Sequence, residues 1–241
     1  FARGRRAQRR AGPVLGDPER GGFEVRKFAE QINAPVALTL LGLGAFPASH
    51  PLNIGMMDMH GEAWVNHAIQ EADLLIALGM RFDDRVTGNI KTYAVNAKKI
   101  HIDIDPSSIN KNVRVDVPIL GDVGTVLEDM VRLWRAASKS ADKARLSDWW
   151  EMITKWRARN SLAYAPNDDV IMPQYAIQRL YELSKGRDTY ITTEVGQHQM
   201  WAAQFYGCEE PHRWMTSGGL GTMGYGLPAA LGVQAAHRDS L

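Results

Sequence analysis

Short apolar runs alternate with helical stretches between residues 36 and 134, and this order restricts the chain to few folds. The apolar runs of strand length are residues 36–40, 74–78, 99–104 and 117–120. A stretch with apolar residues at helical spacing, 62–72, separates the first two runs, and a further one follows the last run to about residue 134. Strands that alternate with helices indicate a parallel sheet wrapped by helices. We therefore expect a doubly wound, Rossmann-like α/β domain over residues 35–137.

The remainder of the chain is predicted to hold a connector and the start of a second domain. Residues 138–168 are charged, contain several Trp residues and have a helical pattern in their middle, which is typical of a helical connector. Residues 169–241 contain a helix pattern at 173–184, a strand pattern at 189–193 and a Gly-rich turn that leads into a helix at 220–236. This order predicts a second α/β domain.

The first 34 residues fit neither domain. Five of the first ten residues are Arg and none is acidic, which favours a solvated end over a transit remnant or a phosphate-binding arm. Pro13 and Pro18 both oppose a central strand, because proline cannot donate to the strand ladder. We expect residues 1–34 to be a divergent segment, with the adjoining edge of the sheet incomplete.

Composition excludes several classes of partner. The formal net charge is +1, from 28 basic and 27 acidic residues, so no overall charge favours a nucleic acid or a membrane surface. No apolar run approaches the length that spans a bilayer. Cys208 is the single cysteine, which excludes an internal disulfide and favours a reducing, cytoplasmic location. Any anion site must therefore be built locally.

Four strings of residues carry a family resemblance. They are Asp58-Met59-His60-Gly61, the string Arg-Phe-Asp-Asp-Arg-Val-Thr-Gly at 81–88, Glu-Val-Gly-Gln-His-Gln-Met-Trp at 194–201, and the Gly-rich string at 217–230. In this order they resemble the large, catalytic subunit of acetohydroxyacid synthase, also called acetolactate synthase. The resemblance extends from about residue 35 to 241, with a break across the connector.

The resemblance implies a transferase that uses thiamine diphosphate. Members of the family decarboxylate pyruvate and condense the two-carbon unit with a second pyruvate or with 2-ketobutyrate, in isoleucine and valine biosynthesis. The cofactor supplies the carbanion chemistry and the protein supplies orientation. The resemblance also implies FAD in a structural role, Mg²⁺, a homo-oligomer and a regulatory small subunit.

Arg81 is the first candidate flavin ligand, because it follows a strand and its terminal Gly79, where a pyrophosphate lies in a dinucleotide site. A surface ion pair with Asp83 or Asp84 is the alternative that the local pattern leaves equally open. The resemblance assigns the whole string, including Gly79, Arg81 and Asp83, to FAD.

Carboxylates also follow the next two strands. Asp103 ends an apolar strand, where a carboxylate can accept hydrogen bonds from ribose hydroxyls, whereas Asp105 before Pro106 is typical of a turn. Asp122 and Val123 resemble a flavin-contacting pair of the family, but a helix N-cap explains Asp122 equally well.

The Met59-His60 pair and Arg85 complete the first half of the predicted site. The resemblance places Met59 and His60 along the isoalloxazine and the substrate channel, and Asp58 stands where the family has Gly. Arg85 takes the position whose guanidinium faces the carboxylate of the second 2-keto acid, a recognition that needs a planar fork. An ion pair with Asp84 is the alternative for Arg85.

The second half of the predicted site is for thiamine diphosphate. In the resemblance Gln197 and His198 lie beside the diphosphate, Gly221 and Met223 flank the rings, and Met223 holds the cofactor bent; for Met223 alone, core packing is the default explanation. We assign catalytic roles to Met223, Gln197 and Arg85. The residues predicted to bind thiamine diphosphate are Val195, Gln197, His198, Gly219, Gly221 and Met223.

The resemblance also shows what these 241 residues do not contain. The Gly-Asp-Gly motif and Asn that hold Mg²⁺ in the superfamily belong just beyond Leu241, and the glutamate that activates the aminopyrimidine belongs to an N-terminal domain. We predict no metal ligands here and no acetolactate formation by this chain alone. The alternatives are a non-catalytic FAD- or nucleotide-binding fragment and another flavin-containing carboligase such as glyoxylate carboligase, which the 81–88 string disfavours.

Overall fold

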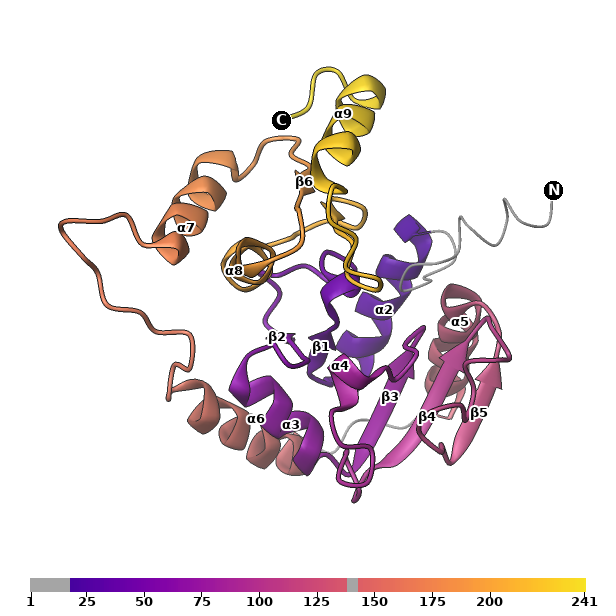
Figure 1. Ribbon diagram of the computed structural model, residues 1–241. Coiled ribbons are helices and arrows are strands. Elements are labelled where there is room, and N and C mark those ends of the chain that lie inside the picture. The colour runs from indigo at the N-terminus through magenta and orange to yellow at the C-terminus, as the bar shows by residue number, and fades with distance from the viewer. Residues whose placement is uncertain (1–17, 138–142) are drawn as a thin grey trace.

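The protein is described by a computed structural model that covers residues 18–137 and 143–241 (Figure 1). The expectations for residues 1–17, including Pro13 and the Arg-rich start, lie outside this description. The strands of the central part are β1 (Val36–Leu38), β2 (Asn53–Met56), β3 (Leu74–Leu78), β4 (Lys98–Asp103) and β5 (Val117–Leu120). Its helices are α2 (Pro18–Ile32), the 3-10 turn η1 (Leu40–Gly42), α3 (Ala63–Glu71), α4 (Asp84–Thr87) and α5 (Val123–Ala136).

All strand pairs of the central part are parallel, as the alternating pattern predicts. β3, β4 and β5 form one sheet in that order, with Ile76 opposite Ile100 and Ile102 opposite Ile119. β1 pairs with β2 in a second, two-stranded sheet. The strand predicted at 74–78 has the observed bounds, whereas β2 was not predicted.

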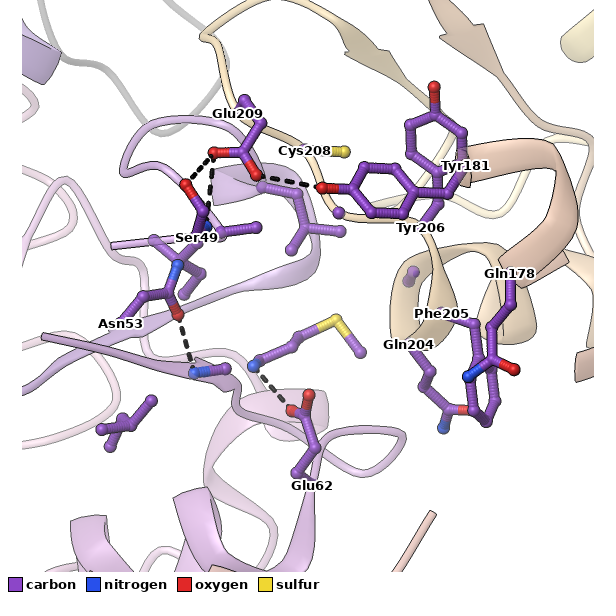
Figure 2. A pocket seen from close by; sticks show the side chains of 18 of the residues that line it. Ser49, Asn53, Glu62, Gln178, Tyr181, Gln204, Phe205, Tyr206, Cys208 and Glu209 are labelled. Carbon is purple, nitrogen blue, oxygen red and sulfur yellow. Dashed lines mark hydrogen bonds between the residues drawn. The ribbon is translucent and has the colours of Figure 1, made fainter. Parts of the chain in front are cut away.

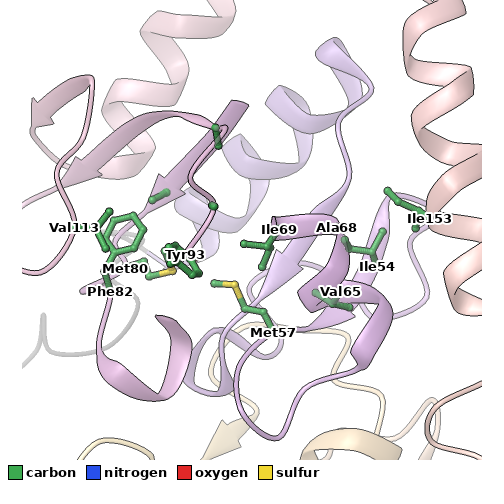
Figure 3. Close-up of a cluster of buried hydrophobic side chains, with 13 residues drawn as sticks. Ile54, Met57, Val65, Ala68, Ile69, Met80, Phe82, Tyr93, Val113 and Ile153 are labelled. Atoms are coloured by element: carbon green, nitrogen blue, oxygen red, sulfur yellow. The ribbon is translucent and has the colours of Figure 1, made fainter. Parts of the chain in front are cut away.

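Helices cover both faces of the three-stranded sheet, so the doubly wound prediction is confirmed. Successive side chains of β3 point to opposite faces. Ala77 enters a cluster with Val65 and Ile69 of α3 (Figure 3). Ile76 and Leu78 pack instead against the cluster formed by α2 and α5.

Helix α2 was not predicted, and it is part of the core. Val25, Phe28 and Ala29 are buried against residues of α5 such as Leu127. Pro18 opposes a strand but is tolerated in the first turn of a helix, where its missing N–H has no intrahelical partner to lose. The segment before residue 35 therefore supplies a helix rather than a strand.

The connector contributes α6 (Lys143–Arg157), in agreement with the predicted helix. Ile153 of α6 is 1% exposed and belongs to the same cluster as Val65 and Ala68 of α3. Trp149 and Trp156 pack against this cluster and against one another, with ring centroids 5.8 Å apart. The connector thus covers one face of the central part.

The C-terminal part contains α7 (Pro173–Ser184), β6 (Ile191–Thr192), α8 (Gln197–Phe205), β7 (Trp214–Met215) and α9 (Gly226–Ala236). Helix α7 has the predicted bounds, β6 is shorter than the predicted strand, and α8 was not predicted. β6 and β7 are parallel, so both parts of the chain are α/β. None of the helices in the described residues is long and apolar enough to cross a membrane.

Candidate functional site

The Met59-His60-Gly61 loop follows β2 and is held by backbone hydrogen bonds. The N–H of Met59 donates to the carbonyl oxygen of Arg85 at 3.0 Å, and the N–H of His60 donates to Oδ1 of Asp58 at 2.6 Å. Asp58 has φ 126°, in the region that L-residues rarely adopt and glycine adopts freely. This backbone conformation favours glycine, the residue that the resemblance leads us to expect at position 58.

Two buried carboxyl groups lie at the base of this loop. Burial raises the pKa of Asp58, which is 7% exposed, and hydrogen bonds from the backbone partly oppose that effect. Burial also raises the pKa of Glu62 to about 7, although its carboxylate accepts a 2.6 Å hydrogen bond from the N–H of Met56. Arg157 lowers the pKa of Glu62 and the charge of Asp58 raises it. The loop at 59–61 therefore lies between two buried carboxyl groups whose pKa values are both raised.

Arg81 lies in the turn between β3 and α4. Gly79 has φ 61°, which turns the chain after β3, and Asp83 caps α4 by accepting from the N–H groups of Arg85 and Val86. Nη2 of Arg81 lies 3.3 Å from Oδ2 of Asp83, so the surface ion pair exists. The Arg81 side chain is 62% exposed, and an ion pair this exposed contributes about 0–1 kcal/mol. A bound phosphate group can therefore replace Asp83 as the partner of the Arg81 guanidinium with little loss of free energy.

Arg85 contacts the Met59 loop. Its Nη1 lies 3.8 Å from the sulfur of Met59. Among the described residues its guanidinium forms no ion pair with Asp84, so the alternative to a ligand role is not realised. Met59 is 59% exposed. The two side chains thus form one exposed surface from segments 26 residues apart.

The carboxylate at the end of β4 is buried. Asp103 is 6% exposed, accepts a 2.8 Å hydrogen bond from the N–H of Asp105, and lies 3.7 Å from Nε2 of His101. His101 is fully buried, and burial lowers its pKa. The Asp105 carboxylate accepts hydrogen bonds from the N–H and the hydroxyl of Ser107, which also lower its pKa. Asp105 is therefore a turn residue.

Asp122 and Val123 begin α5. Asp122 accepts a 3.0 Å hydrogen bond from the N–H of Thr125 and is the N-cap of the helix. Val123 is 1% exposed and belongs to the core. The capping explanation for Asp122 is thus realised. Asp103 ends β4 and Asp122 follows β5, so both lie at the same edge of the sheet.

The first predicted thiamine diphosphate residues lie at the start of α8. Gly196 precedes the helix with φ 147°, and Gln197 and His198 occupy its first turn with exposed side chains. The N–H groups of a helix's first turn lack intrahelical partners and favour anions. This end of α8 therefore suits the diphosphate position that the resemblance gives it.

The Gly-rich loop between β7 and α9 is folded around Glu194. The Glu194 carboxylate accepts hydrogen bonds from the N–H groups of Gly224, at 2.7 Å, and Gly226, and these bonds lower its pKa. Gly221 has φ 65° and lies against Val195. Met223 is 80% exposed, so it does not pack in the core of the described residues.

The two halves of the predicted site meet across the domain junction. Nε2 of Gln204 in α8 donates a 2.7 Å hydrogen bond to the carbonyl oxygen of His60. A Cβ on Gly219 would lie 3.8 Å from Nη2 of Arg81. Figure 1 shows the loop after β7 reaching from α9 toward the central part. The flavin and thiamine segments of the prediction thus lie side by side.

A groove of about 630 Å³ lies beside this site, between β2 and helices α7 and α8 (Figure 2). Its polar groups bind one another: Glu209 accepts from the hydroxyls of Ser49, at 2.8 Å, and Tyr181, at 3.3 Å. None of the predicted cofactor residues lines it. We interpret the groove as the seam of the domain junction, and the candidate site as the exposed surface around Arg81, Arg85 and Gly219.

Sequence reasoning missed two residues beside this site, Glu62 and Gln204, and one backbone conformation within it. Asp58 was identified as a departure, but its positive φ was not predicted. Glu62 gave no signal, because a Glu at a helix start is ordinary. Gln204 gave none either, since its contact joins positions 144 residues apart. In the described residues no cluster of three or more His, Cys, Asp or Glu could hold a metal ion.

Family comparison matches both parts of this architecture. Residues 19–130 match the central domain of thiamine pyrophosphate enzymes, and residues 194–241 match their C-terminal TPP binding domain. The chain therefore belongs to the thiamine pyrophosphate enzymes, and thiamine diphosphate is the cofactor that the second match supports. The first match begins inside α2, in accordance with the packing of that helix on the sheet.

Within this class, the chain is similar to acetolactate synthase large subunits. It is 49% identical over 213 residues to acetolactate synthase isozyme 3 large subunit of Escherichia coli (strain K12), which is 88% of this chain and 37% of that protein. It is 50% identical over 213 residues, with the same coverage, to the large subunit of Buchnera aphidicola subsp. Schizaphis graminum, and 46% identical over 228 residues to acetolactate synthase 1, chloroplastic, of Zea mays. The Zea mays match covers 93% of this chain and 35% of that protein. The chain thus spans about a third of the length of these relatives.

Proposed function

We propose that this chain forms the flavin-binding domain and the first part of the thiamine diphosphate-binding domain of an acetolactate synthase large subunit. The observation that carries the proposal is the meeting of the two predicted half-sites, through Gln204 and His60 and through Gly219 and Arg81. Identity of 46–50% to acetolactate synthases over most of the chain supports it. The whole enzyme would be a transferase of branched-chain amino acid biosynthesis.

The residues present fit FAD. Arg81 offers an exposed guanidinium at the end of β3, and Asp103 and Asp122 follow the next two strands at the same edge. Ligands of such sheets bind outside the carboxyl ends of the strands. The Arg81 fork would hold the pyrophosphate, Asp103 a ribose hydroxyl, and the Met59-His60 loop the ring system.

The residues present also fit the thiamine half-site. Gly221 and Gly224 adopt positive φ, and the exposed Gln197 and His198 lie at a helix start. Bound thiamine diphosphate supplies a carbanion equivalent to the reaction. The chain's own part is to hold the diphosphate at α8 and to place the Met223 side chain against the rings. The ligands for Mg²⁺ are assigned to residues that follow this segment in the family.

Arg85 is proposed to bind the second substrate. A 2-keto acid such as pyruvate or 2-ketobutyrate carries a carboxylate that a guanidinium can hold by two parallel hydrogen bonds. Arg85 is exposed and lies against Met59, beside the predicted flavin ring position. A homo-oligomer and a regulatory small subunit are the partners proposed for the whole enzyme.

Flavin binding by the purified chain tests the proposal. We expect saturable quenching of FAD fluorescence, weakened at least about tenfold by Arg81→Ala, since a charge-assisted hydrogen bond contributes roughly 1.5–3 kcal/mol. Arg132→Ala is the matched control, because the Arg132 side chain is also largely exposed and forms an ion pair, with Asp129 of the same helix. A folded chain that binds no FAD, or that binds it equally well in both variants, would contradict the proposal.

A further inference from the structure

Gln204 is the residue through which α8 holds the Met59-His60-Gly61 loop. Its Nε2 donates to the carbonyl oxygen of His60 at 2.7 Å, a short and partly buried hydrogen bond. A backbone carbonyl can accept only from a donor, so the amide nitrogen of Gln204 must face His60. The contact joins the central domain to the C-terminal part at the groove beside the candidate site.

The geometry of α8 extends this contact to the thiamine half-site. Gln197 and Gln204 are seven residues apart in one continuous helix, which is about two turns, so both lie on the same face, about 10 Å apart along the axis. The helix is fixed at its base by Ala202 and Ala203, which are buried with Met56 of β2. The Gln204 amide and the first turn of α8 thus belong to one packed helix, so the position of Gln204 relative to Gln197 is fixed.

The backbone of the loop at 59–61 is fixed by hydrogen bonds. The N–H groups of Met59, His60 and Gly61 are all bonded, to Arg85 and to the side chain and carbonyl of Asp58. Asp58 holds this turn with a positive φ that disfavours any residue except glycine. A strained backbone persists only where the surrounding contacts over-determine it, and the hydrogen bond from Gln204 to the His60 carbonyl is one of those contacts.

We propose that Gln204 is a positioning residue that sets the register between the flavin loop and the thiamine diphosphate helix. We call the hydrogen bond from Gln204 to the His60 carbonyl the clamp. The clamp is argued from the contacts above, whereas its effect on cofactors rests on the proposed function. Gln204 acts through the His60 carbonyl and is not proposed to touch either cofactor.

The clamp is tested without any cofactor by amide hydrogen exchange of the purified chain. Gln204→Met keeps the side-chain volume and removes the donor. We expect exchange in the peptide that contains residues 59–61 to become about fivefold faster, the factor that corresponds to one ordinary hydrogen bond. Gln204→Lys returns a donor of similar reach and should restore most of the protection. Unchanged exchange at 59–61 in Gln204→Met would overturn the proposal.

Gln234→Met is the matched control. The Gln234 amide also donates to a backbone carbonyl, that of Arg238 at 2.8 Å, but the contact is local to the end of α9. This variant should leave exchange at 59–61 unchanged. Equal acceleration in both variants would show a general loss of stability and would contradict a positioning role.

The consequence for cofactors is measured on the same proteins. We expect Gln204→Met to weaken FAD binding about fivefold and thiamine diphosphate binding in the same direction, with Gln204→Lys restoring both. If the wild-type chain binds no FAD while exchange responds as expected, the proposed function fails and the clamp stands. If FAD binds and Gln204→Met changes neither exchange nor affinity, the clamp fails and the proposed function stands.

Discussion

Asp58 holds a glycine conformation with a charged side chain. Its φ of 126° is strained for any L-residue, while its carboxylate accepts a hydrogen bond from the N–H of His60. The two effects separate if the side chain is removed in two ways. Asp58→Gly and Asp58→Ala both lose the hydrogen bond, but only Gly relieves the backbone.

We expect Asp58→Gly to be more stable than Asp58→Ala by about 1 kcal/mol or more, because alanine retains the strained φ. Urea denaturation of both variants measures the difference. Glu71 is exposed at the end of α3 and gives the opposite control. There the Glu71→Ala variant should be more stable than Glu71→Gly by about 1 kcal/mol, because alanine is preferred over glycine in a helix. Equal order at both positions would show that position 58 does not select glycine.

Glu62 makes stability depend on pH. Burial raises its pKa from 4.5 to about 7, so the folded state binds a proton that the unfolded state releases between these values. Stability contributed by Glu62 is therefore full below pH 4.5 and declines as pH rises to about 7. At pH 8 the ionised Glu62 therefore lowers the free energy of unfolding by roughly 3 kcal/mol relative to low pH.

Glu62→Gln removes this titration and keeps an oxygen that can accept from the N–H of Met56. We expect the variant and the wild type to have the same free energy of unfolding at pH 5. At pH 8 the value of the variant should be about 2–3 kcal/mol higher, because burial destabilises the charged carboxylate but not the neutral amide. Denaturant unfolding at the two pH values measures this. Glu71→Gln, on the exposed end of α3, should show no such dependence, and a wild type whose stability is flat from pH 5 to 8 would contradict the assignment.

At the scale of elements, the sequence was informative where periodicity was complete. The strand 74–78 and the helix 173–184 have the predicted bounds, because apolar residues recur through each at one spacing. α2 was not predicted: Pro13 and Pro18 oppose a strand, but proline is tolerated in the first turn of a helix, where Pro18 lies. α8 was missed because its residues are treated in the family as ligands, and its packing comes from distant Met56.

Helix α2 should be required for the stability of the central sheet. Phe28 is 7% exposed in the cluster shared with α5, so Phe28→Ala should lower the free energy of unfolding by about 3–5 kcal/mol. Phe23 lies on the same helix but is 57% exposed, with Lys27 over its ring. Phe23→Ala should cost at most about 1 kcal/mol. Similar effects in thermal unfolding would show that α2 is only loosely attached.

At the scale of the whole molecule, the sequence predicted the segments of the site but not how they meet. The motifs name Met59, Arg81 and Met223 as residues of the predicted site. How the two parts of the chain meet depends on contacts between residues more than a hundred positions apart, such as Gln204 with His60 and Ser49 with Glu209. Such pairs leave no periodic trace in one sequence, so they are visible only once the two parts are packed.

The junction between the two parts also depends on Gly44. It has φ 86°, and a Cβ there would collide with the backbone carbonyl of Glu210, close to the contact of Ser49 with Glu209. Gly44→Ala therefore adds a clash between the two parts to the cost of a strained φ. Gly186 has φ 80° with nothing within 4 Å of a Cβ, so Gly186→Ala carries the strain alone.

We expect Gly186→Ala to cost about 1 kcal/mol, and Gly44→Ala to cost clearly more, because a backbone oxygen cannot move aside as a flexible side chain can. Gly44→Ala should also speed amide exchange at both 44–49 and 206–210, the two sides of the junction, while Gly186→Ala changes exchange only near 184–188. Equal costs in the two variants, with exchange at the junction unchanged, would mean that the parts do not depend on this contact. The candidate site would then need another source of its alignment, since Arg81 and Gly219 face each other only while the junction holds.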